Sequence, residues 1–197
     1  MVSEGVTHSL DVEAQVWQLL DSVCDPEIPV VSLRELGVLR SVTANDAGAD
    51  TWVEVVITPT YSGCPAMGQM EDDVKAALQA AGITATVRTV LAPAWTTDWM
   101  SDTARDKLKA YGIAPPGRVH VVGAASPGHA VIQFAPKLVA KNAYGYSGKA
   151  DFNADVVACP RCESVNTTET SHFGSTACKA MYKCLDCLEP FDHFKPY

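Results

Sequence analysis

Two pairs of closely spaced cysteines constrain the fold of this chain more than any other feature of its sequence. Cys159 and Cys162 form one Cys-x2-Cys pair, Cys184 and Cys187 form a second, and residues 163–183 (21 residues) separate them. Each pair can hold two thiolates about 3.5 to 4 Å apart on a tight turn, and two such turns complete a tetrahedral metal site. The spacing therefore predicts a zinc-ribbon-like module over residues 158–197. Because so short a module buries little apolar surface, we expect metal binding to supply much of its folding free energy.

The four cysteines leave the identity of the bound group open. Zinc is the leading metal, but four thiolates also suit a single iron or an iron-sulfur cluster. A redox dithiol, or four unrelated cysteines, is the alternative to a metal site. Glu163 and Leu188 follow the two pairs where such turns often carry glycine, which predicts less regular turns. Cys178 is a fifth thiol in the module, and a buried apolar role is favoured for it over a ligand or redox role.

The composition argues against two other classes of protein. The chain has 197 residues, of which 47% are hydrophobic and 19% charged, so it can bury a core. Its formal net charge of -8 argues against non-specific binding of DNA or RNA, which needs a cationic surface. Glycine, proline and histidine interrupt the longest uncharged stretch, residues 119–136, so we expect no membrane span. The first residues lack a secretory signal, so we expect a cytoplasmic protein whose cysteines are thiols or metal ligands.

Hydrophobic periodicity predicts the elements that precede the cysteine module. Helices are expected over residues 10–23 and 65–81, strands over 38–44, 52–58 and 83–91, and a last helix from Ser101, its N-cap candidate, to Gly112. In the second strand, Val53, Val55 and Ile57 alternate inward. Helices on one face of a small three-stranded sheet give an α+β fold. We therefore expect a loose N-terminus (1–8), an α+β domain (9–115), a low-charge insertion or linker (116–157) and a separate cysteine module (158–197).

A single cysteine before the second helix is the most informative residue of the α+β domain. Pro65 suits the first position of a helix, which would make Cys64 its N-cap. At that position the helix dipole and the unpaired amides favour a thiolate, so we expect a lowered pKa and a better nucleophile or metal ligand. A buried structural cysteine is the equal alternative. Asp25 and Glu27 are candidate anionic or metal-binding partners of this loop.

Several segments resemble the metal-sulfur cluster biosynthetic domain family over residues 10–115. They are Asp25-Pro26-Glu27-Ile28-Pro29, Leu36-Gly37-Val38, the stretch from Val56 to Ala66, and the stretch from Pro93 to Trp99. The four paired cysteines, the stretch from Phe173 to Ala180 and Glu189-Pro190-Phe191 narrow the resemblance to the D-subunit family of bacterial phenylacetyl-CoA epoxidase systems, which act in aerobic phenylacetate degradation. The chain departs from that family at residues 117–157, which are longer than its usual connection, and at Glu163, where it commonly has glycine.

The resemblance implies an accessory maturation factor that is not itself an enzyme. The family's loop cysteine maps to Cys64 and its acidic turn to Asp25 and Glu27, which implies transient binding of iron or an iron-sulfur cluster there. The implied partners are the oxygenase and/or reductase components of the epoxidase, and a homodimer is plausible. The chain also lacks a Gly-x-Gly-x-x-Gly dinucleotide motif. The alternative is a structural subunit whose ribbon bridges epoxidase components while Cys64 is merely buried.

Overall fold

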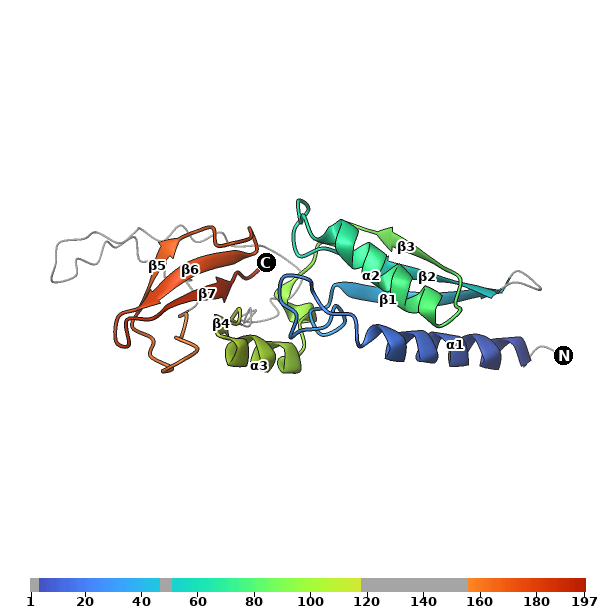
Figure 1. The fold of residues 1–197 in the computed structure, drawn as a ribbon, viewed down its shortest axis with the longest axis horizontal. Coiled ribbons are helices and arrows are strands. Elements are labelled where there is room, and N and C mark those ends of the chain that lie inside the picture. Colours follow the sequence, from blue (N-terminus) through green and yellow to red (C-terminus); the bar gives the residue numbers. More distant parts are fainter. Residues whose placement is uncertain (1–3, 47–50, 118–155) are drawn as a thin grey trace, which may run out of the picture.

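The described part of the chain forms two β-sheets that lie next to each other. The computed structural model describes residues 4–46, 51–117 and 156–197, and Figure 1 shows the two sheets along the long axis of the molecule. The first sheet has the order β1-β2-β3, and the second has the order β4-β7-β6-β5. Three helices accompany them. The predicted α+β fold is confirmed.

The first sheet combines an antiparallel and a parallel pair of strands. Strands β1 (Leu39–Asp46) and β2 (Thr51–Ile57) are antiparallel, whereas β3 (Ala85–Thr89) runs parallel to β2. Parallel neighbours need a crossover connection, and helix α2 (Met67–Ala80) supplies it. The inward positions expected in β2 are confirmed, because Val53, Val55 and Ile57 are all fully buried, although Val56 between the last two is buried as well.

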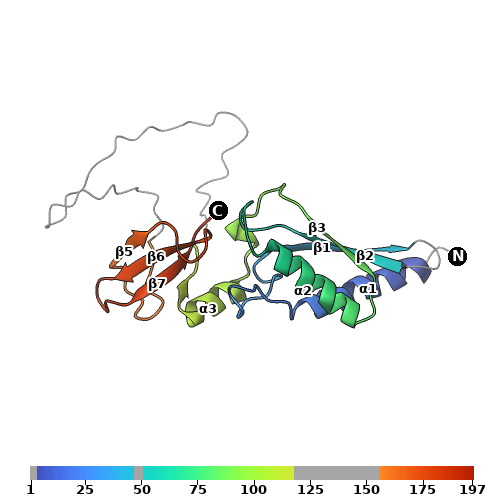
Figure 2. The ribbon, with the colours of Figure 1, turned by 45° about the horizontal axis from the view of Figure 1, so that its top comes forward.

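Helices α1 (Glu4–Leu20) and α2 cover one face of this sheet, as Figure 2 shows. Helix α2 buries Met70, Val74 and Leu78, which are spaced four residues apart and so lie along one stripe of the helix. Helix α1 contributes the fully buried Val16 and Leu20 to the same core. The two helices and the sheet therefore enclose a single apolar layer.

The helix ends show where the sequence prediction holds and where it fails. Helix α3 (Asp102–Tyr111) has the expected caps: the Ser101 hydroxyl accepts the Ala104 N–H at 3.0 Å, and Gly112 is left-handed. Helix α1 begins at Glu4, so residues 4–8 are helical rather than loose. The apolar pattern begins only at Leu10, but backbone hydrogen bonds carry a helix beyond its buried face.

The second sheet is less independent of the first than we expected. Strand β4 (Ile113–Ala114) comes from the predicted first domain, yet it pairs in parallel with β7 (Pro190–Phe194). Strands β5 (Thr167–Ser171) and β6 (Lys179–Cys184) complete the sheet. Phe194 and Trp95 are both buried, with ring centroids 5.9 Å apart, so the C-terminal strands share a core with the first sheet. A strand of two residues leaves no periodicity to recognise, which is why the sequence suggested a separate module.

Two further expectations concern the insertion and the membrane. The predicted insertion, residues 116–157, lies almost wholly outside the described residues. Among the helices that the structure describes, none is both long and apolar enough for a membrane span.

A tight backbone approach next to the first sheet gives a test of the fold. Gly37 has φ +74, and a Cβ there would lie 2.6 Å from both the Cβ and the carbonyl oxygen of Trp99. We predict that Gly37→Ala lowers the free energy of unfolding by about 3 kcal/mol, because left-handed strain and overpacking add. Gly82 has φ +73 but open space around it, so Gly82→Ala should cost about 1 to 2 kcal/mol from strain alone. Urea unfolding measures both, and equal losses would contradict the close approach.

Candidate functional site

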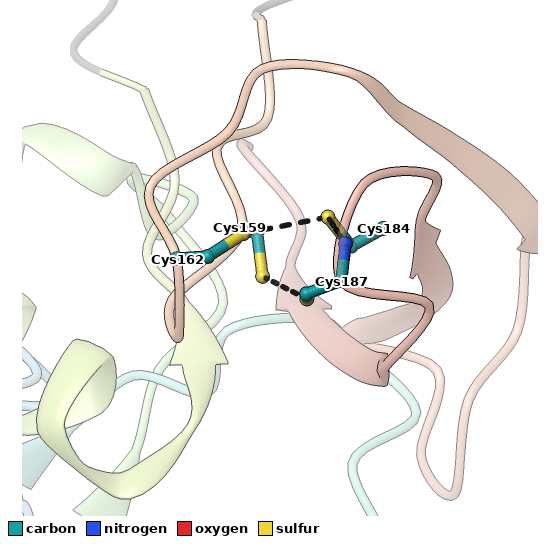
Figure 3. Close-up of side chains that lie close together, drawn as sticks. All are labelled: Cys159, Cys162, Cys184 and Cys187. Carbon is teal, nitrogen blue, oxygen red and sulfur yellow. Dashed lines mark hydrogen bonds between the residues drawn. The ribbon is translucent and has the colours of Figure 1, made fainter.

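The four paired cysteines meet at one end of the second sheet. Cys159 and Cys162 lie on the turn before β5, whereas Cys184 ends β6 and Cys187 lies on the turn into β7, as Figure 3 shows. Their four sulfur atoms lie within 4.8 Å of one another. The sulfurs of Cys159 and Cys187 are 3.8 Å apart, and those of Cys162 and Cys184 are 3.6 Å apart. This is the arrangement that a single tetrahedral metal ion requires.

The two cysteine turns are alike, contrary to the expectation of irregular turns. Glu163 has φ 62 and Leu188 has φ 66, so both residues adopt the left-handed conformation for which such turns often use glycine. In each turn the first cysteine is held by its backbone: Cys159 N–H donates to Ser164 O and Cys184 N–H donates to Glu189 O, both at 2.9 Å. The expectation was wrong because a residue other than glycine can adopt the left-handed conformation at a cost of only about 1 to 2 kcal/mol.

The electrostatics of the four sulfurs favour a cation among them. The Cys187 N–H donates to the Cys184 sulfur at 3.4 Å and lowers the pKa of Cys184 to about 7. The Ser164 N–H likewise favours the Cys162 thiolate, but the three neighbouring sulfurs outweigh it and raise the pKa of Cys162 to about 12. Four thiolates so close together repel one another unless a positive ion neutralises them. The donor set is soft and four-fold, which fits zinc or iron and not a hard cation.

The second group of candidate residues surrounds the loop between β2 and α2. Cys64 is half-buried in this loop, and its N–H donates to Tyr61 O at 3.3 Å. Helix α2 begins at Met67 with Ala66 at its N-cap, so the prediction that Cys64 caps the helix is wrong. The Cys64 carbonyl instead accepts the Met67 N–H at 3.4 Å, which closes a turn ahead of the helix.

The thiol of Cys64 is not activated in the way that its position suggested. Burial raises the pKa of Cys64, and the negative charges of Asp25, Cys178 and Glu27 raise it further. The Ala66 N–H lowers this pKa but does not compensate. The prediction of a lowered pKa is therefore wrong, because desolvation and nearby anions outweigh the amide groups at the start of α2.

Asp25 is the buried member of the acidic turn. It is 9% exposed, and its Oδ1 accepts the N–H groups of Glu27 at 2.8 Å and Ile28 at 3.0 Å. Burial raises the pKa of Asp25 in spite of these two hydrogen bonds. Glu27 is exposed. The structure thus brings Asp25 and Glu27 within electrostatic range of Cys64, as the loop hypothesis requires.

The sequence does not indicate that two further residues lie in this region, although Cys178 was itself a candidate thiol. Cys178 lies just before β6 and is 8% exposed, and it belongs to the same packed cluster that Cys64 contacts. The adjacent Lys179 is also buried, and its charge acts on both Asp25 and Cys178. Because the second sheet brings them here from a distant part of the chain, no local motif connects them to Cys64. The expectation that Cys178 is buried agrees with the structure, but its surroundings are not wholly apolar.

Known protein families match both halves of the chain. A family model described as "Iron-sulfur cluster assembly protein" matches residues 13–92, and one described as "PaaD zinc beta ribbon domain" matches residues 145–195. The chain is 43% identical over 183 residues to an Escherichia coli protein named as the D subunit of a 1,2-phenylacetyl-CoA epoxidase, and the match covers 92% of this chain and 91% of the relative. The predicted resemblance is confirmed.

Two further similarities concern the first half alone. A Porphyromonas gingivalis protein named "Fe-S protein maturation auxiliary factor" is 35% identical over 101 residues, which is 50% of this chain and 92% of the relative. A Bacillus anthracis domain named DUF59, of unknown function, has a crystal structure similar to this half, with a TM-score of 0.47. Its sequence is 29% identical to this chain, and the match covers 52% of this chain and 96% of that one.

Loss of one paired cysteine tests the metal centre. We predict that Cys184→Ser reduces the bound metal from about one ion per chain to near zero, and that β5 to β7 lose protection because metal binding stabilises them. Trypsin should then cleave after Lys179 and Lys183, which lie on β6. Metal analysis and limited proteolysis measure both effects. Cys24→Ser, which changes a half-buried thiol outside both sites, should alter neither. Full metal content in Cys184→Ser would contradict the four-cysteine site.

The electrostatics of Cys64 predict how its alkylation depends on pH. Because only the thiolate reacts, the midpoint of Cys64 alkylation in metal-free protein should lie above the ordinary value of about 8.5. Asp25→Asn removes a neighbouring negative charge and should move the midpoint down, though burial keeps it above that value. Glu27→Gln should have a smaller effect because Glu27 is exposed. Peptide mass spectrometry measures the profiles. A wild-type midpoint below the ordinary value would support the hypothesis that Cys64 is an activated thiol.

Proposed function

We propose that this chain, which belongs to the family of the 1,2-phenylacetyl-CoA epoxidase D-subunit proteins, is an accessory factor that assists iron or iron-sulfur cluster assembly in that system. The observation that carries the proposal is the half-buried Cys64 within electrostatic range of the buried carboxylate of Asp25, in the half of the chain that matches the iron-sulfur cluster assembly model. A thiol and a carboxylate are both ligands for iron. We place the factor in the cytoplasm, where thiols stay reduced.

The raised pKa of Cys64 suits a carrier that releases its cargo. In the empty site burial favours the protonated thiol of Cys64. Cys64 must therefore give up its proton to bind iron, and it takes a proton back when the iron leaves. This proton cost weakens binding at neutral pH relative to an activated thiolate. A carrier needs such intermediate affinity, because a site that binds too tightly cannot pass its cargo on.

The second sheet supplies a surface for the recipient component. Val165, Leu185 and Leu188 are large apolar side chains near the two cysteine turns, and all three are exposed. A group of exposed apolar residues at a rigid metal-held turn is typical of a protein-binding surface. We assign this surface to the oxygenase or the reductase component of the epoxidase.

The proposal includes no catalytic role in the epoxidation. Glu169 and His172 have the Glu-x-x-His spacing of carboxylate di-iron proteins, but Glu169 lies on strand β5 and His172 follows that strand. Both side chains are exposed, with Glu169 Oε1 and His172 Nδ1 3.2 Å apart. Carboxylate di-iron sites instead use such motifs on facing helices, with their side chains directed into a bundle core.

A structural protein that bridges epoxidase components is the second candidate. The exposed apolar side chains around the cysteine turns favour it, and so does the raised pKa of Cys64, which a merely buried cysteine would also show. The two candidates differ in what Cys64 does. A carrier needs its sulfur, whereas a bridging protein functions without it.

Substitution of Cys64 separates the two candidates. We predict that Cys64→Ser, in a host that expresses the complete epoxidase, lowers the iron content and activity of the recipient component while complex formation persists. Metal analysis of the purified oxygenase and reductase measures this effect, and Cys24→Ser is the matched control. For a bridging protein, Cys64→Ser would leave iron content unchanged, and Leu188→Asp would disrupt the complex instead. Unchanged iron and activity in Cys64→Ser would overturn the carrier proposal.

A further inference from the structure

We propose that Asp186 is a positioning residue of the four-cysteine metal site. It lies between Cys184 and Cys187 in the chain, and its carboxylate binds side chains that follow the other pair of cysteines. These hydrogen bonds hold the two cysteine turns at the separation that a single metal ion requires. The inference concerns the metal of the second sheet and not the cargo, so it is independent of the carrier proposal at Cys64.

Both oxygens of the Asp186 carboxylate accept hydrogen bonds from the segment that follows Cys162. Oδ1 accepts the side-chain amide of Asn166 at 2.7 Å, and Oδ2 accepts the hydroxyl of Ser164. These donors lie 20 and 22 residues away in the sequence, on the opposite cysteine turn. Hydrogen bonds to an ionised carboxylate are roughly twice as strong as those between neutral groups. The side chain of Asp186 therefore connects one cysteine turn to the other.

The two donors are themselves held by the backbone around them. The Ser164 hydroxyl accepts the Asn166 N–H at 3.0 Å, so the donors are joined to each other. The Ser164 carbonyl accepts the Cys159 N–H at 2.9 Å, which connects this pair directly to a candidate metal ligand. The Asn166 carbonyl accepts the Leu185 N–H at 2.8 Å, and this bond also runs between the two turns. Asp186 thus binds a pair of donors whose positions are already fixed.

The position of Asp186 determines what these bonds do for the sulfurs. Asp186 directly precedes Cys187, whose N–H donates to the Cys184 sulfur at 3.4 Å. A displacement of Asp186 would therefore shift both candidate ligands of its turn. Figure 3 shows the two turns on opposite sides of the sulfur group. Ionised sulfurs repel one another and so favour separation of the turns, whereas the bonds of Asp186 oppose that separation. A site arranged in advance leaves a smaller ordering cost for metal binding to offset.

The negative charge of Asp186 offers a different explanation, because any nearby anion attracts a cation. Asp186 is exposed, so solvent screens its charge, whereas its hydrogen bonds depend on direct contact. Glu163 gives a matched control. It is also exposed and directly follows Cys162, but its carboxylate pairs with Lys109 of helix α3 and not with the second cysteine turn. Glu163→Gln therefore removes the same charge beside a candidate ligand and leaves the bonds of Asp186 intact.

The test measures the affinity of the full chain for Zn²⁺ by competition with a chelator, after its own metal has been removed under reducing conditions. We expect Asp186→Ala to weaken binding at least about tenfold, since loss of a partner outside the ligand shell commonly costs ten- to a hundredfold. Asp186→Asn should lose only about threefold, because an amide can accept from Asn166 and donate to the Ser164 hydroxyl, though as a neutral group. Glu163→Gln should stay within about twofold of the wild type.

A double-mutant cycle separates positioning from a general loss of stability in the second sheet. Asn166→Ala removes one donor and should weaken Zn²⁺ binding less than Asp186→Ala does. The two substitutions combined should cost no more than Asp186→Ala alone, because both remove the same hydrogen bond. Substitutions that merely destabilise the sheet at independent positions would give losses that add. The visible spectrum of the Co²⁺-loaded protein verifies that each variant binds metal through sulfur.

The inference is overturned by wild-type affinity in Asp186→Ala, or by losses that add in the double variant. It is also overturned if Glu163→Gln loses as much affinity as Asp186→Ala, since charge alone then accounts for the effect. If Asp186→Ala binds no Zn²⁺ at all, recovery of binding in Asp186→Asn supports the inference, and equal failure of both variants contradicts it.

Discussion

Repulsion among four cysteine sulfurs within 4.8 Å of one another is the constraint on which the second sheet depends. The apolar cluster inside this sheet is small, and two of its five buried members, Cys159 and Cys184, are themselves part of the sulfur group. So small a core offers little hydrophobic stabilisation, and two left-handed residues in the turns cost about 1 to 2 kcal/mol each. A cation among the sulfurs removes the repulsion and connects both turns. We therefore expect metal binding and folding of β5 to β7 to be coupled.

The other side of the second sheet belongs to the core of the first. Phe194 packs against Trp95, and Tyr197 contacts the same ring at 6.3 Å between centroids. Strand β4, which directly follows α3, pairs with β7 of the second sheet. This shared core includes Cys178, and Cys64 packs against the same core. A metal ion that stabilises the second sheet would thus also stabilise the packing around Cys64. The two halves, each recognisable by its own family model, act as one unit in this account.

Local patterns in the sequence predicted the features that depend on interactions between residues close together in the chain. Alternation identified β2, the caps identified α3, and the Cys-x2-Cys spacing identified the residues whose sulfurs converge. Features that depend on distant contacts were missed. The pairing of β4 with β7 and the position of Cys178 join remote parts of the chain. The raised pKa of Cys64 follows from burial and from charges that the tertiary fold assembles, which a motif of neighbouring residues does not encode.

Through the shared core, we expect metal at the four cysteines to control order at the Cys64 site. Hydrogen exchange of the wild-type protein, with its metal and after chelation, tests this coupling. Without metal, we expect faster exchange in β5 to β7 and also at the amides of Glu27 and Ile28, which donate to Asp25. The amides that pair β2 with β3 should be unchanged. Faster exchange confined to residues 157–197 would contradict this coupling, because the two halves would then behave independently.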